Sequence, residues 1–173
     1  MSGILLLLPF LLIRFGLLAV VNIGAVKRAA YFAPMRKNES WIYWIYQISN
    51  IAIFVSLCFL KIKADDLWWF YAGTAFYVLG LVFCAASIVS FAIPSKEGLN
   101  TNGIYRFSRN PMYVSYFMIF LGFACMTASL ILGGIVMVFI VASHWIILAE
   151  ERWCIAKFGG AYRQYMQRVR RYL

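Results

Sequence analysis

The chain has 173 residues, of which 64% are hydrophobic and only 13% are charged. Soluble globular domains contain about 25% charged residues, so this composition excludes an ordinary soluble domain and indicates an integral membrane protein. A net charge of +10 would suggest a nucleic-acid partner in a soluble protein. Here the basic residues lie between apolar segments, where membrane orientation explains them better, and we expect no nucleic-acid partner.

Four apolar windows are long enough to cross the hydrocarbon core of a bilayer, which requires about 20 residues of α-helix. They are residues 3–26, 41–60, 68–93 and 113–149. The last window is too long for one crossing, and Thr127, Ser129 and Gly133–Gly134 near its middle favour a tight helical hairpin. We therefore predict an all-α membrane bundle of five transmembrane helices in one domain, residues 1–173. The last two helices form the hairpin, and the fourth is short.

The basic residues are distributed unequally between the segments that join these helices. With five spans and the N-terminus outside, only Lys61 and Lys63 are placed on the outer side, and Arg14 lies within the first span. All other lysines and arginines fall on the inner side, as the positive-inside rule favours. We therefore expect a multi-pass protein whose C-terminus and whose loop before the fourth helix face the cytoplasm.

A short amphipathic helix is expected after the last span. Gly159–Gly160 interrupts the long helix, and Tyr162, Tyr165, Met166, Val169 and Tyr172 then fall on one side at helical spacing. This pattern favours a cytoplasmic helix lying in the headgroup region. A solvated basic tail held by anionic lipid would fit the same residues.

The four cysteines and the arginine in the first span are the next features of the sequence. The four cysteines show no C-x-x-C spacing, so neither a disulfide frame nor a metal site is expected. Arg14 either extends its charge to the membrane surface or makes a polar contact inside the bundle. The sequence leaves both interpretations open.

Acidic residues are scarce, so the pair Glu150 and Glu151 at the inner end of the fifth span is informative. Such a pair can simply mark the end of a span, but adjacent acids near the bilayer are costly without partners. His144 precedes Glu151 by two helical turns and projects from nearly the same face, toward which Arg152 also leans. His144 and Arg152 are therefore candidate catalytic residues, although a lone membrane histidine more often serves packing.

The segment before the fourth helix is rich in turn residues. They are Pro94, Gly98, Asn102–Gly103 and Asn110–Pro111. Glycine and asparagine permit backbone shapes whose N–H groups turn inward, so such a loop can bind a carboxylate or a ribose hydroxyl. A plain connector would also fit. Because the loop lies on the same side as the paired glutamates, the two together could enclose a zwitterionic ligand.

Three sequence motifs in this half of the chain resemble the isoprenylcysteine carboxyl methyltransferase family, which is similar to the phosphatidylethanolamine N-methyltransferases. They are GIYRFSRNPMY at residues 103–113, the glutamate pair, and KFGGAYRQYMQRV at residues 157–169. The resemblance places the catalytic part at about residues 94–173. The family has a histidine where this chain has Asn110, an exchange that keeps a hydrogen-bond donor and an acceptor.

The resemblance implies a pocket for S-adenosylmethionine, with S-adenosylhomocysteine as product, at the cytoplasmic end of the bundle. The cofactor-binding residues that it implies are Leu99, Asn100, Gly103, Tyr105, Asn110, Pro111, Met112, Tyr113, Glu150 and Glu151. The implied acceptor is a lipid or a lipidated small molecule that reaches the methyl group from within the bilayer. No obligate protein partner is indicated.

Methyl transfer from a sulfonium is an in-line displacement, so a protein must align the reacting atoms and exclude water. A carboxylate acceptor is already nucleophilic, and Arg109 or Arg152 would position it. An amine acceptor must lose a proton, and His144 or a glutamate would be the base. The alternatives are a phospholipid N-methyltransferase, an NADPH-dependent reductase of the sterol type, and a membrane protein without enzymatic activity.

Overall fold

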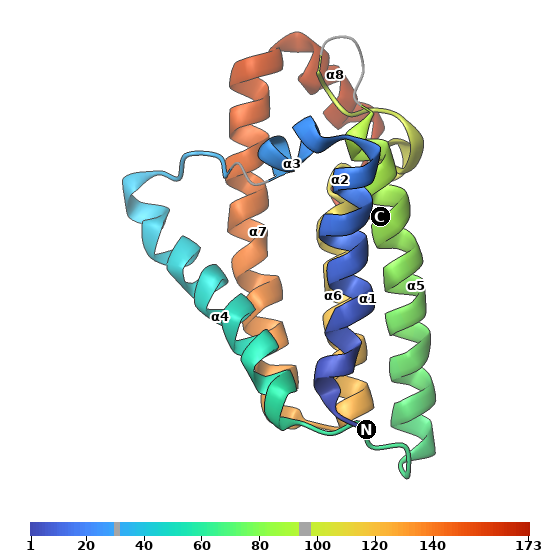
Figure 1. Ribbon diagram of the computed structural model, residues 1–173. Helices are drawn as coiled ribbons and strands as arrows, with labels where there is room; N and C mark the ends of the chain where they lie inside the picture. Colours follow the sequence, from blue (N-terminus) through green and yellow to red (C-terminus); the bar gives the residue numbers. More distant parts are fainter. Residues whose placement is uncertain (30–31, 94–97) are drawn as a thin grey trace.

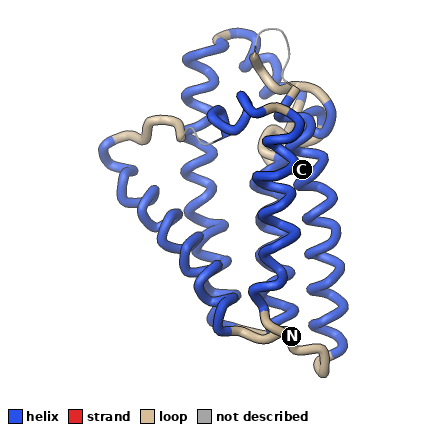
Figure 2. Tube along the Cα trace, in the orientation of Figure 1, coloured by secondary structure: helices blue, strands red, loops and turns tan. Residues whose placement is uncertain are grey.

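The computed structural model describes residues 1–29, 32–93 and 98–173, and these residues form helices and connecting loops without a named strand (Figures 1 and 2). The predicted all-α class is confirmed. Four helical segments are long and apolar enough to cross a membrane, namely Gly3–Val21, Ser40–Phe59, Leu67–Ala92 and Leu130–Phe158. The turn predicted at Pro94 lies outside the described residues.

The first span is not a uniform α-helix. It runs through η1 (Gly3–Leu6), α1 (Leu7–Leu11), the π-helical η2 (Leu12–Leu17) and α2 (Leu18–Val21). The prediction that it continues to Val26 is wrong, because Asn22 adopts an extended conformation and α3 (Ile23–Ala29) turns away from the bundle axis (Figure 1).

Asn22 stabilises this break with both ends of its side chain. Its Oδ1 accepts a hydrogen bond of 3.0 Å from the Gly24 N–H, and its Nδ2 donates one of 2.9 Å to the Ala92 carbonyl. The first bond gives the Gly24 N–H, in the first turn of α3, an acceptor that the helix itself does not supply. The second fixes the break against the end of α5 (Leu67–Ala92).

The helices α5 and α6 (Pro111–Thr127) pack closely because glycines lie between them. A Cβ atom at Gly80 would come within 2.9 Å of the Ile119 backbone nitrogen, and one at Gly122 within 2.9 Å of the Gly73 carbonyl. Small residues allow helix backbones to approach in this way inside membranes. The helix α4 (Ser40–Phe59), preceded by η3 (Lys37–Glu39), packs instead on α7 (Leu130–Phe158).

The apolar run predicted at residues 113–149 is divided between α6 and α7. Ala128 has a left-handed conformation with φ of 45°, and the Ser129 hydroxyl accepts a hydrogen bond from the Leu132 N–H at 3.2 Å. The pair Gly133–Gly134 lies inside α7 and not in the turn. With 17 residues, α6 spans about 26 Å, which is shorter than a hydrocarbon core of about 30 Å.

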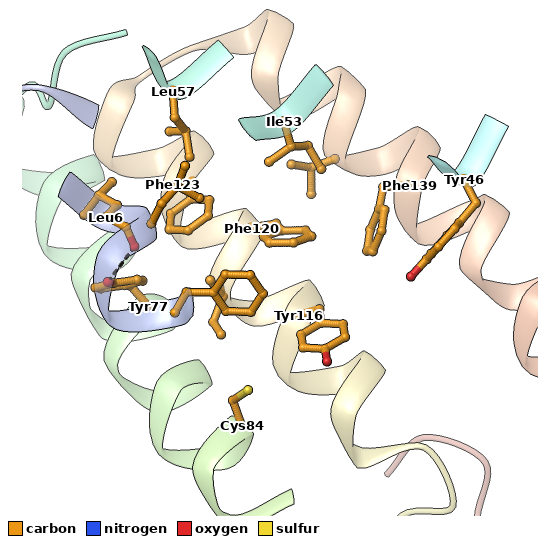
Figure 3. Packing of buried hydrophobic residues seen from close by; sticks show 14 of the residues in the cluster. Leu6, Tyr46, Ile53, Leu57, Tyr77, Cys84, Tyr116, Phe120, Phe123 and Phe139 are labelled. Atoms are coloured by element: carbon orange, nitrogen blue, oxygen red, sulfur yellow. Dashed lines mark hydrogen bonds between the residues drawn. The ribbon is translucent and has the colours of Figure 1, made fainter. Parts of the chain in front are cut away.

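An aromatic core fills the middle of the bundle (Figure 3). Phe120 lies at its centre, with ring centroids 5.0 Å from Phe139 and 5.7 Å from Phe123. Tyr77 contributes its hydroxyl, which donates to the Leu6 carbonyl at 2.8 Å. The core lies between the two ends of the molecule. Among the described residues, backbone hydrogen bonds join loops of the same end, such as Lys63 with Met126 at one end and Arg109 with Arg170 at the other.

The chain finishes with α8 (Gly160–Arg168), which follows α7 after Gly159. Tyr162 and Tyr165 are its buried residues and pack with Leu99 from the loop before α6. The predicted amphipathic helix is thus present, but Val169 and Tyr172 lie beyond its end. The residues after Arg168 fold back, so that the Arg109 N–H donates to the Arg170 carbonyl at 2.9 Å.

Candidate functional site

A cavity of about 530 Å³ lies at the end of the bundle that carries α3, α8 and the loop before α6. Its walls come from the first span, α3 and the residues that follow it, α4, the end of α5, this loop, α6, α7 and α8. Ligand pockets in proteins measure about 300–1,000 Å³, so the cavity is large enough for a cofactor. It is partly apolar and contains several charged side chains.

Glu150 presents a carboxylate to this cavity. The Tyr113 hydroxyl donates a hydrogen bond of 2.7 Å to its Oε1 atom. The contact joins α6 to α7, and it brings the Asn-Pro loop and the glutamate pair together as the sequence predicted. No arginine or lysine among the described residues forms an ion pair with Glu150, so its carboxyl group is available to a ligand.

Glu151 lies in a buried ion network with two arginines. Its carboxylate is 3.1 Å from an Nη2 atom of Arg109 and 2.8 Å from that of Arg171, and its side chain is 5% exposed. The hydrogen bonds that the Arg171 guanidinium donates to the Glu151 carboxylate raise the pKa of Arg171. Glu151 therefore holds the Asn-Pro loop and the residues after α8 to the end of α7.

Asn110 strengthens the same connection. Its Nδ2 donates to the Arg171 carbonyl at 3.1 Å, and its backbone N–H donates to the Ser108 hydroxyl at 3.2 Å. Pro111 follows as the first residue of α6, where its missing N–H costs nothing and its fixed φ suits the helix. The loop thus enters α6 in a single defined direction.

The helix α8 covers the loop from the other side. The Tyr165 hydroxyl donates to the Tyr105 carbonyl at 2.6 Å, and both residues line the cavity. Burial raises the pKa of Tyr165, so its phenol stays protonated and remains a donor. This hydrogen bond holds α8 against the loop whose residues Leu99 and Asn100 also line the cavity.

Three buried side-chain atoms of the described residues have no hydrogen-bond partner in the protein. They are Nη1 of Arg14, Oδ1 of Asn100 and Nε of Arg109. All three residues line the same cavity. Because an unpaired buried polar atom costs about 1–3 kcal/mol, their concentration in one place indicates a site completed by a polar ligand.

The structure brings most of the predicted residues to the cavity and leaves four of them elsewhere. Those at the cavity are Leu99, Asn100, Tyr105, Arg109, Asn110, Met112, Tyr113, Glu150 and Glu151; those elsewhere are Gly103, Pro111, His144 and Arg152. Gly103 has a φ of 56° and lies so close to α5 that a Cβ atom would come within 2.3 Å of the Ser90 hydroxyl. Its role there is to permit a close contact.

The two candidate catalytic residues of α7 outside the cavity have other partners. The Nδ1 atom of His144 is 2.7 Å from the Tyr172 hydroxyl, in a separate apolar groove. Arg152 forms an ion pair with Glu39 before α4. The predicted shared face of His144 and Glu151 is real, but both side chains contact the residues after α8.

The cavity also includes residues that the sequence did not assign to the site. Arg14, Tyr46 and Tyr116 come from the first span, α4 and α6, and Lys157 and Tyr162 come from α7 and α8. A signal existed for Arg14, which is the charged residue of the first span. The tyrosines offered no signal, because aromatic residues are common throughout this chain.

A comparison with known protein families finds one model, described as phospholipid methyltransferase, that matches residues 68–161. The match includes α5, the loop, α6 and α7 with its glutamate pair. Neither the curated proteins nor the solved structures contain a match to this chain.

Proposed function

Since the chain belongs to the phospholipid methyltransferase family, which includes the isoprenylcysteine carboxyl methyltransferases, we propose that it is an S-adenosylmethionine-dependent membrane methyltransferase. The observation that carries the proposal is the set of unpaired polar atoms around one cavity. In this proposal the methyl acceptor is a lipid or a lipidated small molecule.

The residues of the cavity fit the cofactor. When bound, S-adenosylmethionine supplies an electrophilic methyl group on a positively charged sulfur. Asn100 offers an unpaired acceptor and Arg109 an unpaired donor, while Glu150 offers a carboxylate that Tyr113 holds in place. These groups match a ligand that carries an amine, hydroxyls, a carboxylate and a cation.

The protein would contribute alignment and exclusion of water. Tyr113 orients the Glu150 carboxylate, and Glu151 orients Arg109 through their ion pair. Tyr165 holds α8 over the loop, which limits access of water from that side. If the acceptor is an amine, Glu150 is the candidate base, because His144 lies outside the cavity.

The heat of binding of S-adenosylhomocysteine and of NADPH to the detergent-purified protein tests this proposal. Saturable binding of S-adenosylhomocysteine alone is expected. Binding of NADPH alone would favour the reductase, and binding of neither would remove the proposed activity.

Replacing Glu150→Gln keeps the shape of the side chain and removes its charge. We expect the affinity for S-adenosylhomocysteine to fall more than tenfold, or about 1.4 kcal/mol. The matched control is Glu39→Gln, whose carboxylate pairs with Arg152 outside the cavity, and which should leave the affinity unchanged. Equal affinities in the two variants would exclude Glu150 from the site.

The proposed orientation has α6 as a fifth crossing, with the N-terminus outside and the cavity at the cytoplasmic face. It is supported by the contacts of α6, which begins beside the cavity and ends where the Lys63 N–H donates to the Met126 carbonyl at 2.9 Å. Cysteines introduced at the exposed positions Asp65 and Arg168 test it in intact cells. A membrane-impermeant thiol reagent should label the first and not the second above the level of the parent protein; the reverse pattern would invert the topology.

A further inference from the structure

Arg14 lies deep in the first span, on the π-helical segment η2. Asn22, where the span ends, is eight positions further along the chain, which places the Arg14 backbone about 12 Å from that end. Single π-helical turns within α-helices occur frequently at functional sites, because they alter the direction in which side chains project. Here the altered turn coincides with the charged residue of the span.

The surroundings of Arg14 do not pair its charge. Its guanidinium carbon is 5.7 Å from the ring centroids of Phe15 and Tyr116, and its Nη1 atom is buried without a hydrogen-bond partner. No acidic side chain of the described residues lies within ion-pair distance of it. The contacts with aromatic rings compensate only part of the cost of an unpaired charge at this depth.

Two structural explanations for Arg14 are therefore unsatisfactory. An arginine that reaches toward the membrane surface would expose its guanidinium, whereas Nη1 is buried here. An arginine that stabilises the fold would pair with a carboxylate or a carbonyl. Arg14 instead lines the cavity that also contains Glu150, so the partner missing from the protein is expected in a ligand.

The position of Arg14 distinguishes it from the other unpaired atoms of the cavity. Asn100 and Arg109 belong to the loop before α6, whereas Arg14 belongs to a helix whose neighbouring residues Leu12 and Phe15 are 68% and 57% exposed. These apolar side chains face the hydrocarbon. This segment of the first span therefore borders the cavity through Arg14 and the hydrocarbon through Leu12 and Phe15. Arg14 lies within reach of the head of an amphiphile whose chain stays in the bilayer.

We infer that Arg14 binds the anionic group of the methyl acceptor, a carboxylate or a phosphate at the head of a membrane amphiphile. The inference rests on the proposed function and adds the acceptor's charge to it. The loop, α6 and α7 then bind the cofactor, while the first span selects the acceptor. Arg14 is a specificity-determining residue in this arrangement, and its guanidinium can contact either anion with two parallel hydrogen bonds.

The test uses three probes that share one chain and differ in the head group: dodecyl phosphate, dodecanoate and dodecanol. Their affinities are measured by calorimetry with the full protein saturated with S-adenosylhomocysteine. The variants are Arg14→Gln, Arg14→Lys and, as a control, Arg163→Gln on the exposed side of α8.

We expect the wild-type protein to bind the two anions at least tenfold more tightly than the alcohol. Arg14→Gln should reduce this ratio to near one, Arg14→Lys should retain most of it, and Arg163→Gln should retain all of it. The affinity of Arg14→Gln for S-adenosylhomocysteine should stay within threefold of the wild-type value. Its midpoint of thermal unfolding should not fall, because Nη1 has no protein partner to lose.

Three results would overturn the inference. The first is that the wild-type protein shows no preference for the anions over dodecanol, or that Arg14→Gln keeps this preference undiminished. The affinity for S-adenosylhomocysteine could fall with Arg14→Gln as much as that for the anions, which would assign Arg14 to the cofactor carboxylate. Failure of Arg14→Gln to fold would make the residue structural. A wild-type protein that does not bind S-adenosylhomocysteine refutes the proposed function and not this assignment alone.

Discussion

The two ends of the helical bundle differ in how completely their polar groups are paired. At the N-terminal end, the Gly3 N–H donates to the Leu60 carbonyl at 2.8 Å and the Lys63 N–H to the Met126 carbonyl at 2.9 Å, beneath an apolar core. At the opposite end, the described residues place three buried side-chain atoms without hydrogen-bond partners around a cavity, beside a buried ion network. The first end has the features of a scaffold, and the second has those of a site that a ligand completes.

The largest effect on stability is expected from the ion network around Glu151, which holds the Asn-Pro loop and the residues after α8 to α7. Glu151→Gln removes the counter-charge of Arg109, whose side chain is 8% exposed, and of Arg171. Breaking such a network should lower the stability by about 3–5 kcal/mol, because Arg109 stays buried without a charged partner. The midpoint of thermal unfolding in detergent measures the loss.

The control for this change is Glu39→Gln, which breaks the more exposed ion pair with Arg152. Pairs near the surface contribute about 0–1 kcal/mol, so its midpoint should change little. If both variants shift the midpoint equally, the network around Glu151 does not hold the site together.

A smaller effect is expected in the scaffold. In Gly122→Ala the new Cβ would come within 2.9 Å of the Gly73 carbonyl, so the backbones of α5 and α6 must separate. Overpacking of this kind costs about 1–3 kcal/mol. Gly133→Ala is the matched control, since nothing lies within 4 Å of its Cβ position in α7, and it should be neutral or slightly stabilising. Equal unfolding midpoints would show that α5 and α6 tolerate a wider separation.

The smallest effect concerns Asn110→His, which introduces the residue that the related family has at this position. Asn110 uses its Nδ2 as a donor to the Arg171 carbonyl, and an imidazole N–H can replace that donor. The stability should change by less than about 1 kcal/mol. Asn110→Leu lacks the donor and should lower the unfolding midpoint further; if the histidine variant is the less stable one, the loop fits asparagine specifically.

Much of the site could be predicted from the sequence, because its residues lie next to the ends of apolar runs or within recognisable motifs. The Asn-Pro turn before α6 and the glutamate pair in α7 are each at the end of an apolar run, so counting crossings places them together. The contact between Tyr113 and Glu150 confirms this. The family resemblance then supplied the identity of the neighbouring residues.

The remaining residues depend on packing that periodicity does not reveal. The spacing of His144 and Glu151 correctly gives a common face, but it does not say whether that face points to the cavity or to Tyr172. The end of the first span at Asn22 depends on a hydrogen bond to Ala92, which is 70 residues away. The sequence shows Arg14 as a charged residue in the first span, but the direction in which its side chain projects depends on the π-helical turn.

The short length of α6 has a consequence for how the cavity arises. None of its residues is exposed, so the neighbouring helices shield it from lipid and it avoids the penalty of hydrophobic mismatch. Its partner α7 has 29 residues and spans about 44 Å. The cavity lies where α7 extends past the start of α6, since its lining includes Tyr113 from the first turn of α6 and Cys154, Lys157 and Phe158 from the last turns of α7.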